Sequence, residues 1–505
     1  MNINQHSLLI TLLFFLLSFM VVGSTLAGLK NDKNKDNNTI SIQVIDKQFQ
    51  VDNKGKKAKA FELVFVQPDG STNTKGYYGV KNELFDVIVE NKSSEAITIH
   101  WHGLIVPNNQ DGVPNITQLP IEPGEKKAYK YRLVQSGTYW MHSHQRLQEQ
   151  QQLSAPLIIY ESKDKNPKVQ DIVMFLEDFT YKNPYVLFTN LRDTKMEKMK
   201  SSEDKQKDLN DINYDAYLTN KRSLSNPEVI TTKPNKLVRL RIINASSSTN
   251  YQINLGKLEG QLIAVDGEKI KPIRGNKFPI GIANRLDILI KLPLKKGAYP
   301  ILGLAEGTNK QTGLILTTTK DKPIIPSPTS KNTMGQIDYY KLERKIKSLT
   351  PLKKKPVDLT LNYLLQGTMN GYIWTINKES WPNITPKKVK KGDRVEMIFR
   401  NDNSMSHPMH LHGHVFQVTE INGEPIKDGA RRDTVLVQPH STIKVQFDAD
   451  NPGVWAMHCH NLYHLAAGML TTIEFEGYPL PSFYLNTIGQ VKKTNTELQY
   501  SEEKK

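Results

Sequence analysis

The chain has 505 residues, which is too long for one ordinary domain and suits two to four. Its single cysteine, Cys459, excludes an internal disulfide. The net charge of +16 would suit an anionic partner, but the lysines are scattered over loops and both tails, with no dense stripe interleaved with aromatic residues. We therefore expect a solvated basic surface and no nucleic-acid partner.

The first segment predicts export. An apolar run of fifteen residues, Leu8 to Val22, precedes small residues near Ala27. This run is short for a membrane span and typical of a signal peptide. We expect a signal peptide over residues 1–27 and a periplasmic or secreted protein without stable membrane insertion. Lys and Arg are absent ahead of the run, which leaves an uncleaved N-terminal anchor as the alternative.

The rest of the chain predicts an all-β fold. Short apolar runs rich in β-branched residues, such as residues 85–89, 237–243 and 285–290, recur between turn-forming residues. Their length and spacing favour β-sandwiches over helices or βαβ units. In chain order we expect a first sandwich over 28–165, a second over 166–318, a linker over 319–356, a third sandwich over 357–484 and a polar tail over 485–505.

An internal repeat relates the first and third sandwiches. Residues 137–144 align with residues 453–460, and both segments begin with Gly and end in Met-His-x-His. Upstream of these, the His-x-His-Gly of residues 100–103 matches that of residues 410–413. The two units therefore look like copies of one sandwich, with a middle unit between them.

Histidines carry the strongest functional signal. Eight of the thirteen form four His-x-His pairs, two in each repeated unit. Residues i and i+2 of a strand point to the same face, so each pair offers two imidazoles to one site. Polar alternation on an exposed face produces single pairs, but four are hard to obtain by chance. Clustered imidazoles indicate zinc, copper, iron or nickel and leave the metal open. The pairs are His100/His102, His142/His144, His410/His412 and His458/His460.

The lone cysteine narrows the choice of metal. Cys459 lies between two histidines, so on a strand its side chain points away from both. Three more residues with metal-binding side chains are spaced to join it on that side, namely His407, His464 and Met469. Two imidazoles, one thiolate and one weak axial thioether form the blue-copper ligand set. The alternative is that Cys459 is a small buried hydrophobic residue.

The repeat provides an internal control for this interpretation. Every position of the first unit that matches a member of the thiolate set lacks a metal-binding side chain, yet both of its His-x-His pairs remain. The two sets of ligands are thus kept or lost as separate blocks, as two distinct sites predict. The four matching residues are Ile97, Ser143, Gln148 and Leu153.

These motifs resemble the four copper motifs of the multicopper oxidases. They read His100-Trp-His-Gly, Trp140-Met-His-Ser-His, His407-Pro-Met-His-Leu-His-Gly and His458-Cys-His-x3-His464-x4-Met469. All four occur in order, with no ligand missing. The resemblance runs over residues 85–476 and is closest to the bacterial copper-resistance oxidases and their laccase-like relatives. It implies three cupredoxin-like Greek-key β-sandwiches in a monomer.

The resemblance also implies four copper ions. A type 1 copper would be held by His407, Cys459, His464 and Met469. A type 2 copper would be held by His100 and His410. A type 3 pair would be held by His102, His142, His144, His412, His458 and His460. The type 2 and type 3 ions would form a trinuclear cluster between the first and third sandwiches.

The implied reaction takes electrons singly from a small reductant and reduces dioxygen to water. Electrons would pass from Cys459 to His458 and His460, which adjoin it in the chain. The reductant would be cuprous ion, ferrous ion or a phenol, with a role in copper or iron detoxification. Three methionines flank the ligands, namely Met405, Met409 and Met457. We interpret them as core residues, and the alternative is that they form a path for soft metal ions.

The proton donor for oxygen reduction is less evident. Some relatives place an acidic residue directly after the second type 1 histidine, where this chain has Leu465. Asp111 matches an acid known near the cluster in the family, so we expect it to act there. The alternative for Asp111 is a plain turn role, because it precedes Gly112.

Two other functions compete with this one. A copper nitrite reductase would share the blue site, but it needs only three imidazoles for its second copper. A copper-binding tolerance protein without catalysis would be expected to have lost ligands, whereas this chain keeps all of them.

Overall fold

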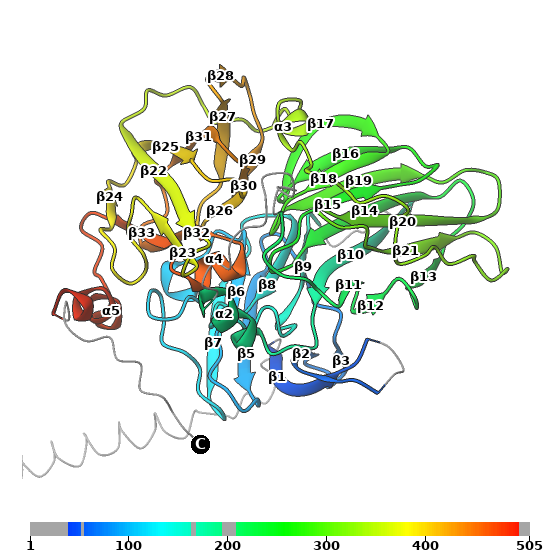
Figure 1. Ribbon diagram of the computed structural model, residues 1–505, viewed down its shortest axis with the longest axis horizontal. Coiled ribbons are helices and arrows are strands. Elements are labelled where there is room, and N and C mark those ends of the chain that lie inside the picture. The colour runs from blue at the N-terminus through cyan, green and yellow to red at the C-terminus, as the bar shows by residue number, and fades with distance from the viewer. Residues whose placement is uncertain (1–38, 52–54, 163–167, 194–208, 494–505) are drawn as a thin grey trace, which may run out of the picture.

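The computed structural model describes residues 39–51, 55–162, 168–193 and 209–493. Their strands form six sheets, which belong in pairs to three consecutive β-sandwiches (Figure 1). The predicted all-β fold is therefore confirmed. Residues 1–27, where the sequence predicts a signal peptide, lie outside the described residues. Within the part of the chain described, no helix is both long enough and apolar enough to cross a membrane.

The first sandwich contains both parallel and antiparallel strand pairs. Its strands are β1 (Ile40–Phe49), β2 (Ala58–Val66), β3 (Thr72–Asn73), β4 (Tyr77–Val80), β5 (Leu84–Asn91), β6 (His100–His102), β7 (Lys126–Arg132), β8 (Gly137–His142) and β9 (Ser154–Tyr160), with a 3-10 turn η1 (Asn108–Gln110) after β6. One sheet has the order β3-β2-β1-β5-β7 and the other β4-β9-β8-β6. Strand β1 pairs with β5 in parallel and with β2 antiparallel.

The middle sandwich is built from a seven-stranded and a five-stranded sheet. Its elements are β10 (Val169–Phe179), α2 (Pro184–Asp193), β11 (Ala216–Thr219), β12 (Arg222–Ser223), β13 (Val229–Thr231), β14 (Leu237–Asn244), β15 (Tyr251–Asn254), β16 (Gly260–Val265), β17 (Glu268–Gly275), β18 (Lys277–Ile280), β19 (Arg285–Lys291), β20 (Ala298–Ala305) and β21 (Gln311–Thr317). The sheet orders are β12-β11-β10-β14-β19-β16-β17 and β13-β21-β20-β15-β18.

The third sandwich follows a long connection that contains the short helix α3 (Tyr340–Glu343). Its elements are β22 (Leu359–Thr368), β23 (Ile373–Ile376), β24 (Lys387–Val389), β25 (Arg394–Asn401), β26 (His407–Leu411), β27 (Phe416–Ile421), β28 (Glu424–Pro425), β29 (Arg431–Arg432), β30 (Thr434–Val437), β31 (Ser441–Asp448), β32 (Val454–Cys459), α4 (Leu462–Ala466), β33 (Leu470–Phe475) and α5 (Ser482–Lys493). Strands β24-β33-β32-β26-β30 form the sheet that carries four of the candidate metal ligands, namely His407 and His410 on β26 and His458 and Cys459 on β32.

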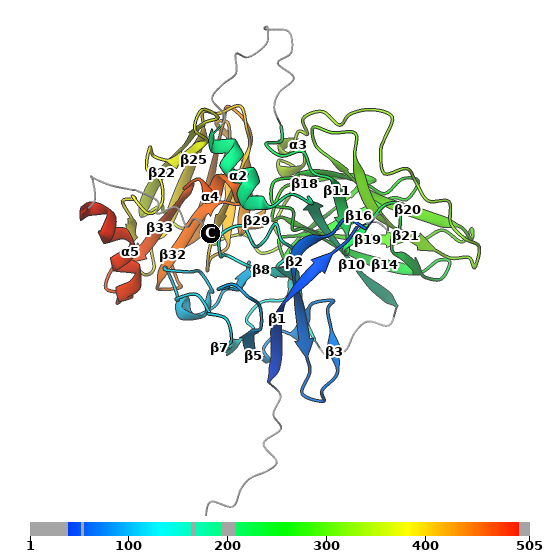
Figure 2. The same cartoon turned by 60° about the horizontal axis from the view of Figure 1, so that its bottom comes forward.

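Alternating burial along the strands produces the core. Strand β31 alternates strictly between buried and partly exposed residues, with Ile443, Val445 and Phe447 pointing inward. This period of two is what a strand with one apolar face requires. Most buried apolar side chains of the three sandwiches belong to one continuous cluster. Figure 2 shows the first sandwich beside both of the others.

The C-terminal part of the described chain contains a helix that the sequence did not predict. The polar tail expected over residues 485–505 begins as the continuation of α5, which ends at Lys493. The helix forms because its apolar side chains have a partner surface, with Phe483, Tyr484 and Ile488 packing on a cluster that includes Val113 and Leu470. Polar residues on the outer face hid this one-sided pattern.

Candidate metal centres

The thiolate site lies where two neighbouring strands of one sheet end. Strands β26 and β32 are antiparallel, with Met409 opposite Cys459 and His410 opposite His458. Alternation along both strands therefore sends His407 and Cys459 to one side of the sheet and His410 and His458 to the other. This is the separation that the sequence predicted.

Helix α4 adds the second imidazole to this side. The Asn461 side chain accepts hydrogen bonds from the backbone N–H groups of Tyr463 and His464, which caps the helix and orients His464. Cys459 Sγ then lies 3.6 Å from His407 Nδ1 and 3.7 Å from His464 Nδ1. The two Nδ1 atoms are 3.2 Å apart. Three donor atoms thus converge on one point, and all three side chains are fully buried.

Backbone hydrogen bonds bring Met469 to the same place. The N–H of Met469 donates to the carbonyl of His464, and the N–H of Cys459 donates to the carbonyl of Met469, both at 3.0 Å. The Met469 side chain is fully buried. Burial raises the pKa of the Cys459 thiol well above its usual value, so the thiolate needs a cation to stabilise it.

The outer edge of His464 is closed by side chains that the sequence did not predict. Trp374 of β23 stacks on the imidazole, with ring centroids 3.8 Å apart. His464 Nε2 donates to Asp211 Oδ2 at 3.1 Å, and the Tyr372 hydroxyl donates to the same oxygen at 2.5 Å. Because Nε2 is occupied by Asp211, Nδ1 is left free to face the thiol. His464 itself has no exposed surface.

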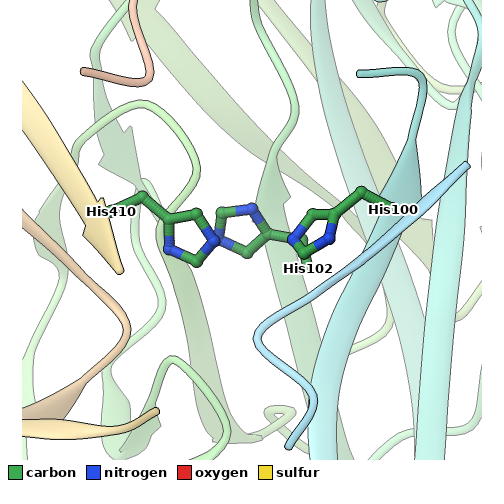
Figure 3. Close-up of side chains that lie close together, drawn as sticks. All are labelled: His100, His102 and His410. Atoms are coloured by element: carbon green, nitrogen blue, oxygen red, sulfur yellow. The ribbon is translucent and has the colours of Figure 1, made fainter. Parts of the chain in front are cut away.

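A second site consists of imidazoles from the first and third sandwiches. Strands β6 and β8 place His100 opposite His142. The ligand nitrogens of the eight paired histidines fall into groups in which each atom lies within 4.8 Å of the others. These groups are His100, His102 and His410; His102, His142 and His460; and His144, His412 and His458. Figure 3 shows the first group, with His410 entering from the third sandwich and His100 from the first.

Several imidazole nitrogens of this second site lack ordinary hydrogen-bond partners. His100 Nε2, His410 Nε2 and His102 Nδ1 are buried without a hydrogen bond. Imidazole nitrogens also approach each other directly, at 3.0 Å between His412 and His458 and 3.2 Å between His144 and His458. Buried polar atoms without partners are costly in a folded protein, and cations at the centre of each group would satisfy them. The donor set therefore fits bound metal ions.

The surroundings of these imidazoles keep them in the neutral form. Burial and the neighbouring imidazoles lower the pKa of His142, His144 and His412 well below the usual value. Burial lowers the pKa of His458 to about 4. The rings are therefore neutral at physiological pH, which is the form that binds a metal ion.

Two buried aspartates hold the cluster in a mirrored arrangement. The carbonyl oxygen of Asp111 accepts from His100 Nδ1 at 2.8 Å, and its carboxylate accepts from His412 Nδ1 at 2.9 Å. The carbonyl oxygen of Asp433 lies 2.8 Å from His410 Nδ1 and accepts from it. The Asp433 carboxylate accepts from His102 Nε2 at 3.1 Å. Each aspartate thus binds one histidine of its own sandwich and one of the other.

A third acid contacts the cluster from the first sandwich alone. Glu149 Oε2 lies 2.8 Å from His142 Nδ1, and both side chains are buried. Burial, reinforced by Asp178 and Glu177, raises the pKa of Glu149 well above its usual value. Carboxylates in this position fix the tautomer of a metal-binding histidine. Neither Glu149 nor Asp433 was predicted from the sequence.

The protein combines three β-sandwiches with a site of one cysteine and two histidines and a separate cluster of eight histidines. This combination indicates an oxidase that binds several copper ions. Comparison with known families agrees, because three models of the multicopper oxidase family match residues 79–164, 170–320 and 354–476. The multicopper oxidase MmcO of Mycobacterium tuberculosis is 32% identical over 406 residues, which cover 77% of this chain and 79% of that protein. The chain belongs to the multicopper oxidase family.

Other relatives extend the comparison. Copper resistance protein A of Escherichia coli is 25% identical over 523 residues, covering 77% of this chain and 85% of that protein. Among solved structures, the multicopper oxidase Fet3p superposes with a TM-score of 0.74 at 19% identity, covering 90% of this chain and 95% of that one. A laccase from Botrytis aclada gives 0.71 at 20% identity, covering 92% and 94%. These structures share the fold of three cupredoxin-like sandwiches.

Membership in the family sets the reaction. The enzyme takes electrons from a reductant and reduces dioxygen to water, and its four copper ions supply the one-electron redox chemistry. The resemblance drawn from the sequence motifs is thereby confirmed.

Proposed function

We propose that the thiolate site is the type 1 copper site, with His407, Cys459, His464 and Met469 as ligands. We further propose that His100 and His410 hold the type 2 copper. The type 3 pair would be held by His102, His142, His144, His412, His458 and His460. The grouping of the imidazole nitrogens supports this division, because His102, His142 and His460 form one group and His144, His412 and His458 another.

The backbone provides the route for electrons between the sites. Cys459 is covalently joined to His458 and His460, whose side chains belong to the imidazole cluster. An electron that enters at the Cys459 sulfur therefore reaches the cluster through a few covalent bonds. Full burial of all three side chains keeps water away from this route.

We propose small low-valent cations, cuprous or ferrous, as the reductants in preference to bulky phenols. A phenol needs contact with the edge of a ligand imidazole, but His464 and His407 have no exposed surface. Asp211 offers a carboxylate at the edge of His464, and its Oδ1 atom is buried without a hydrogen-bond partner. A cation can interact with that oxygen through its full charge, whereas a neutral phenol can offer it only one hydrogen bond.

The methionines that flank the ligands support this proposal less than their sequence positions suggested. Met405 is 7% exposed, and Met409 and Met457 are fully buried in the core. Met409 lies opposite Cys459 on the neighbouring strand. These side chains therefore pack around the thiolate site, and the interpretation as core residues is the better one.

We also propose that Asp111 relays protons to the cluster. Its carboxylate is fully buried and contacts His412, so it lies beside the place where dioxygen would be reduced. We expect Asp111→Asn to lower kcat by roughly 10²–10⁴-fold, the range for a lost acid–base group, with copper content unchanged. Loss of copper from the variant would instead make Asp111 a purely structural partner of His412.

Further proposals concern the location of the protein, its biological role, its oligomeric state and its domain boundaries. The run Leu8 to Val22 supports a cleaved signal peptide over residues 1–27 and a periplasmic or secreted location. Copper resistance protein A among the relatives supports a role in copper or iron detoxification. We propose a monomer, with domain boundaries at the ends of the ranges 28–165, 166–318 and 357–484.

One observation carries the main proposal. Cys459 and two imidazoles converge on one side of a strand pair while eight imidazoles converge on the other. A nitrite reductase would need only three imidazoles in its second site, so the eight favour dioxygen as the acceptor.

Oxygen consumption by the copper-loaded protein tests the proposal. We expect uptake with ferrous and cuprous ions and a lower kcat/KM with 2,6-dimethoxyphenol. A hundredfold preference for the phenol, about 2.7 kcal/mol in transition-state terms, would rule out a metal ion as the main reductant. Bound copper without oxygen uptake would favour a copper-binding tolerance protein.

A further inference from the structure

A row of buried side chains with alternating charge crosses the point where the three sandwiches meet. All of its members are buried. The row connects the linker helix α3 and strand β29 with the middle sandwich and then returns to the third. In spatial order its members are Glu343, Arg432, Asp266, Arg285 and Asp433.

Arg285 is the residue of this row that joins all three sandwiches. It belongs to β19 of the middle sandwich, and its Nη1 and Nη2 both donate to the Asp433 carboxylate, the first at 2.8 Å. Its Nε donates to the carbonyl of Thr138 in the first sandwich at 3.1 Å. Asp433 in turn accepts from His102 Nε2. A bidentate arginine fixes the plane of a carboxylate as well as its charge.

The His-x-His-Gly motif makes room for this ion pair. Gly103, directly after His102, has φ +87°, and a Cβ there would lie 2.5 Å from Asp433 Oδ2 and 2.6 Å from Arg285 Nη2. Any other residue would displace the pair. The close approach of the backbone therefore belongs to the same arrangement that orients His102.

The two mirrored aspartates, Asp111 and Asp433, differ in whether an arginine binds their carboxylate. Asp433 is bound by Arg285, whereas the ion pairs of Asp111 within the described residues involve only His100 and His412. Asp433 is thus a fixed hydrogen-bond acceptor. His102 must donate from Nε2 to this acceptor, which leaves Nδ1 as its free nitrogen, and Nδ1 is the atom without a partner.

We propose that Arg285 is a positioning residue for the imidazole cluster. It holds the Asp433 carboxylate so that His102 keeps its proton on Nε2 and presents Nδ1 to a metal ion. The middle sandwich has no predicted copper ligand, but through Arg285 it controls how tightly the cluster binds copper. This inference rests on the proposed assignment of His102 to the type 3 pair.

A matched pair of substitutions tests the proposal. Arg241 is also a buried arginine of the middle sandwich, bonds to Asp287 and Asp171 and donates to the Thr138 side chain, but among the described residues its acids contact no histidine. Arg285→Lys and Arg241→Lys are each titrated with cuprous ion, and copper per chain and the blue absorption are measured after oxidation. We expect Arg285→Lys to bind copper at the cluster roughly 10–100-fold more weakly, with the blue band unchanged. Arg241→Lys should match the wild type.

The outcomes separate this inference from the function on which it rests. Wild-type copper affinity in Arg285→Lys would overturn it, and so would an equal loss in both variants, which would indicate a general effect of the domain interface. If Arg285→Lys does not fold, Asp433→Asn replaces it, and undiminished copper binding in that variant is likewise contrary to the proposal. A wild-type protein that never becomes blue would contradict the proposed function itself.

Discussion

The first and third sandwiches share a backbone frame around very different side chains. In the third, the N–H of Cys459 donates to the carbonyl of Met469 at 3.0 Å. In the first, the N–H of Ser143 donates to the carbonyl of Leu153 at 2.9 Å. The frame therefore forms without metal ligands, and its geometry does not depend on a blue site.

The side chains at matching positions differ between the two copies. Cys459 Sγ faces His464 Nδ1 at 3.7 Å, while the matching Ser143 Oγ donates to Gln148 Oε1 at 2.8 Å. A serine and a glutamine satisfy each other, whereas a thiol and two imidazoles do not. The side chains of the first copy thus satisfy one another by hydrogen bonds, whereas those of the third copy leave ligand atoms available to a metal ion. The metal site is therefore defined by these available ligand atoms rather than by the fold.

The first copy has an acidic residue at a position where the third copy has none. Glu149 occupies the position in the first copy that Leu465 occupies in the third, because both follow directly after the matched residues Gln148 and His464. The acid that some relatives place after the second type 1 histidine is therefore present here in the other copy, where it contacts His142.

The largest expected effect comes from removing a histidine of the first copy. His142→Ala should lower kcat for oxygen reduction by at least about 10³-fold, since electrons that reach the cluster have no complete site to accept them. The blue absorption should remain, because the thiolate site contains no residue of the first copy. Normal turnover in a copper-loaded variant would show that the first copy does not contribute to the cluster.

Removing the acid of the first copy should have a smaller effect. Glu149→Gln is expected to weaken copper binding at the cluster by roughly 10–100-fold, because an amide replaces the carboxyl group that contacts His142 Nδ1. Copper per chain during dialysis against a chelator measures this. Leu465→Gln, at the matched position, is the control and should retain its copper. Equal retention by both variants would remove Glu149 from the metal site.

The middle sandwich, which contains none of the paired histidines, provides a prediction about pH. Burial raises the pKa of Glu306 from 4.5 to about 6. The folded protein therefore binds this proton more tightly than the unfolded chain, and stability falls as pH rises from about 4.5 to 6. Glu306→Gln should raise the free energy of unfolding at pH 7 by up to about 2 kcal/mol and leave it nearly unchanged at pH 4. Denaturant unfolding at both pH values checks this, and a pH-independent difference would count against it.

The smallest effect concerns access to the thiolate site. Trp374→Leu should raise kcat/KM for 2,6-dimethoxyphenol relative to ferrous ion by about tenfold, or about 1.4 kcal/mol, because the stacked ring no longer covers His464. Trp455→Leu, which also removes a buried tryptophan of this sandwich but does not open the edge of His464, is the control. An unchanged ratio would show that donors do not approach from this side.

The sequence predicted the candidate metal ligands, but of the acids that hold them it predicted only Asp111. Strand alternation and the repeat predicted that Cys459 and the paired histidines face opposite sides, because a period of two assigns each side chain to a face, and the structure gathers both groups in this way. The assignment of the copper ligands stays a prediction. Asp433 lies 331 residues from His102, so no local pattern connects them. Trp374 and Asp211 are brought to His464 by β23 and by the segment before β11, and only the packing of separate units reveals such contacts. Helix α5 was missed because its apolar side meets a surface formed by distant strands.

The copper content and colour of Cys459→Ser test the central claim most directly. If the thiolate site and the imidazole cluster are separate, the variant should lose the blue absorption and about one of its four coppers while it keeps the rest, since all eight paired histidines are intact. The double variant His142→Ala/His144→Ala should show the reverse, blue protein with a depleted cluster. A Cys459→Ser protein that stays blue, or that loses all of its copper together, would contradict the account.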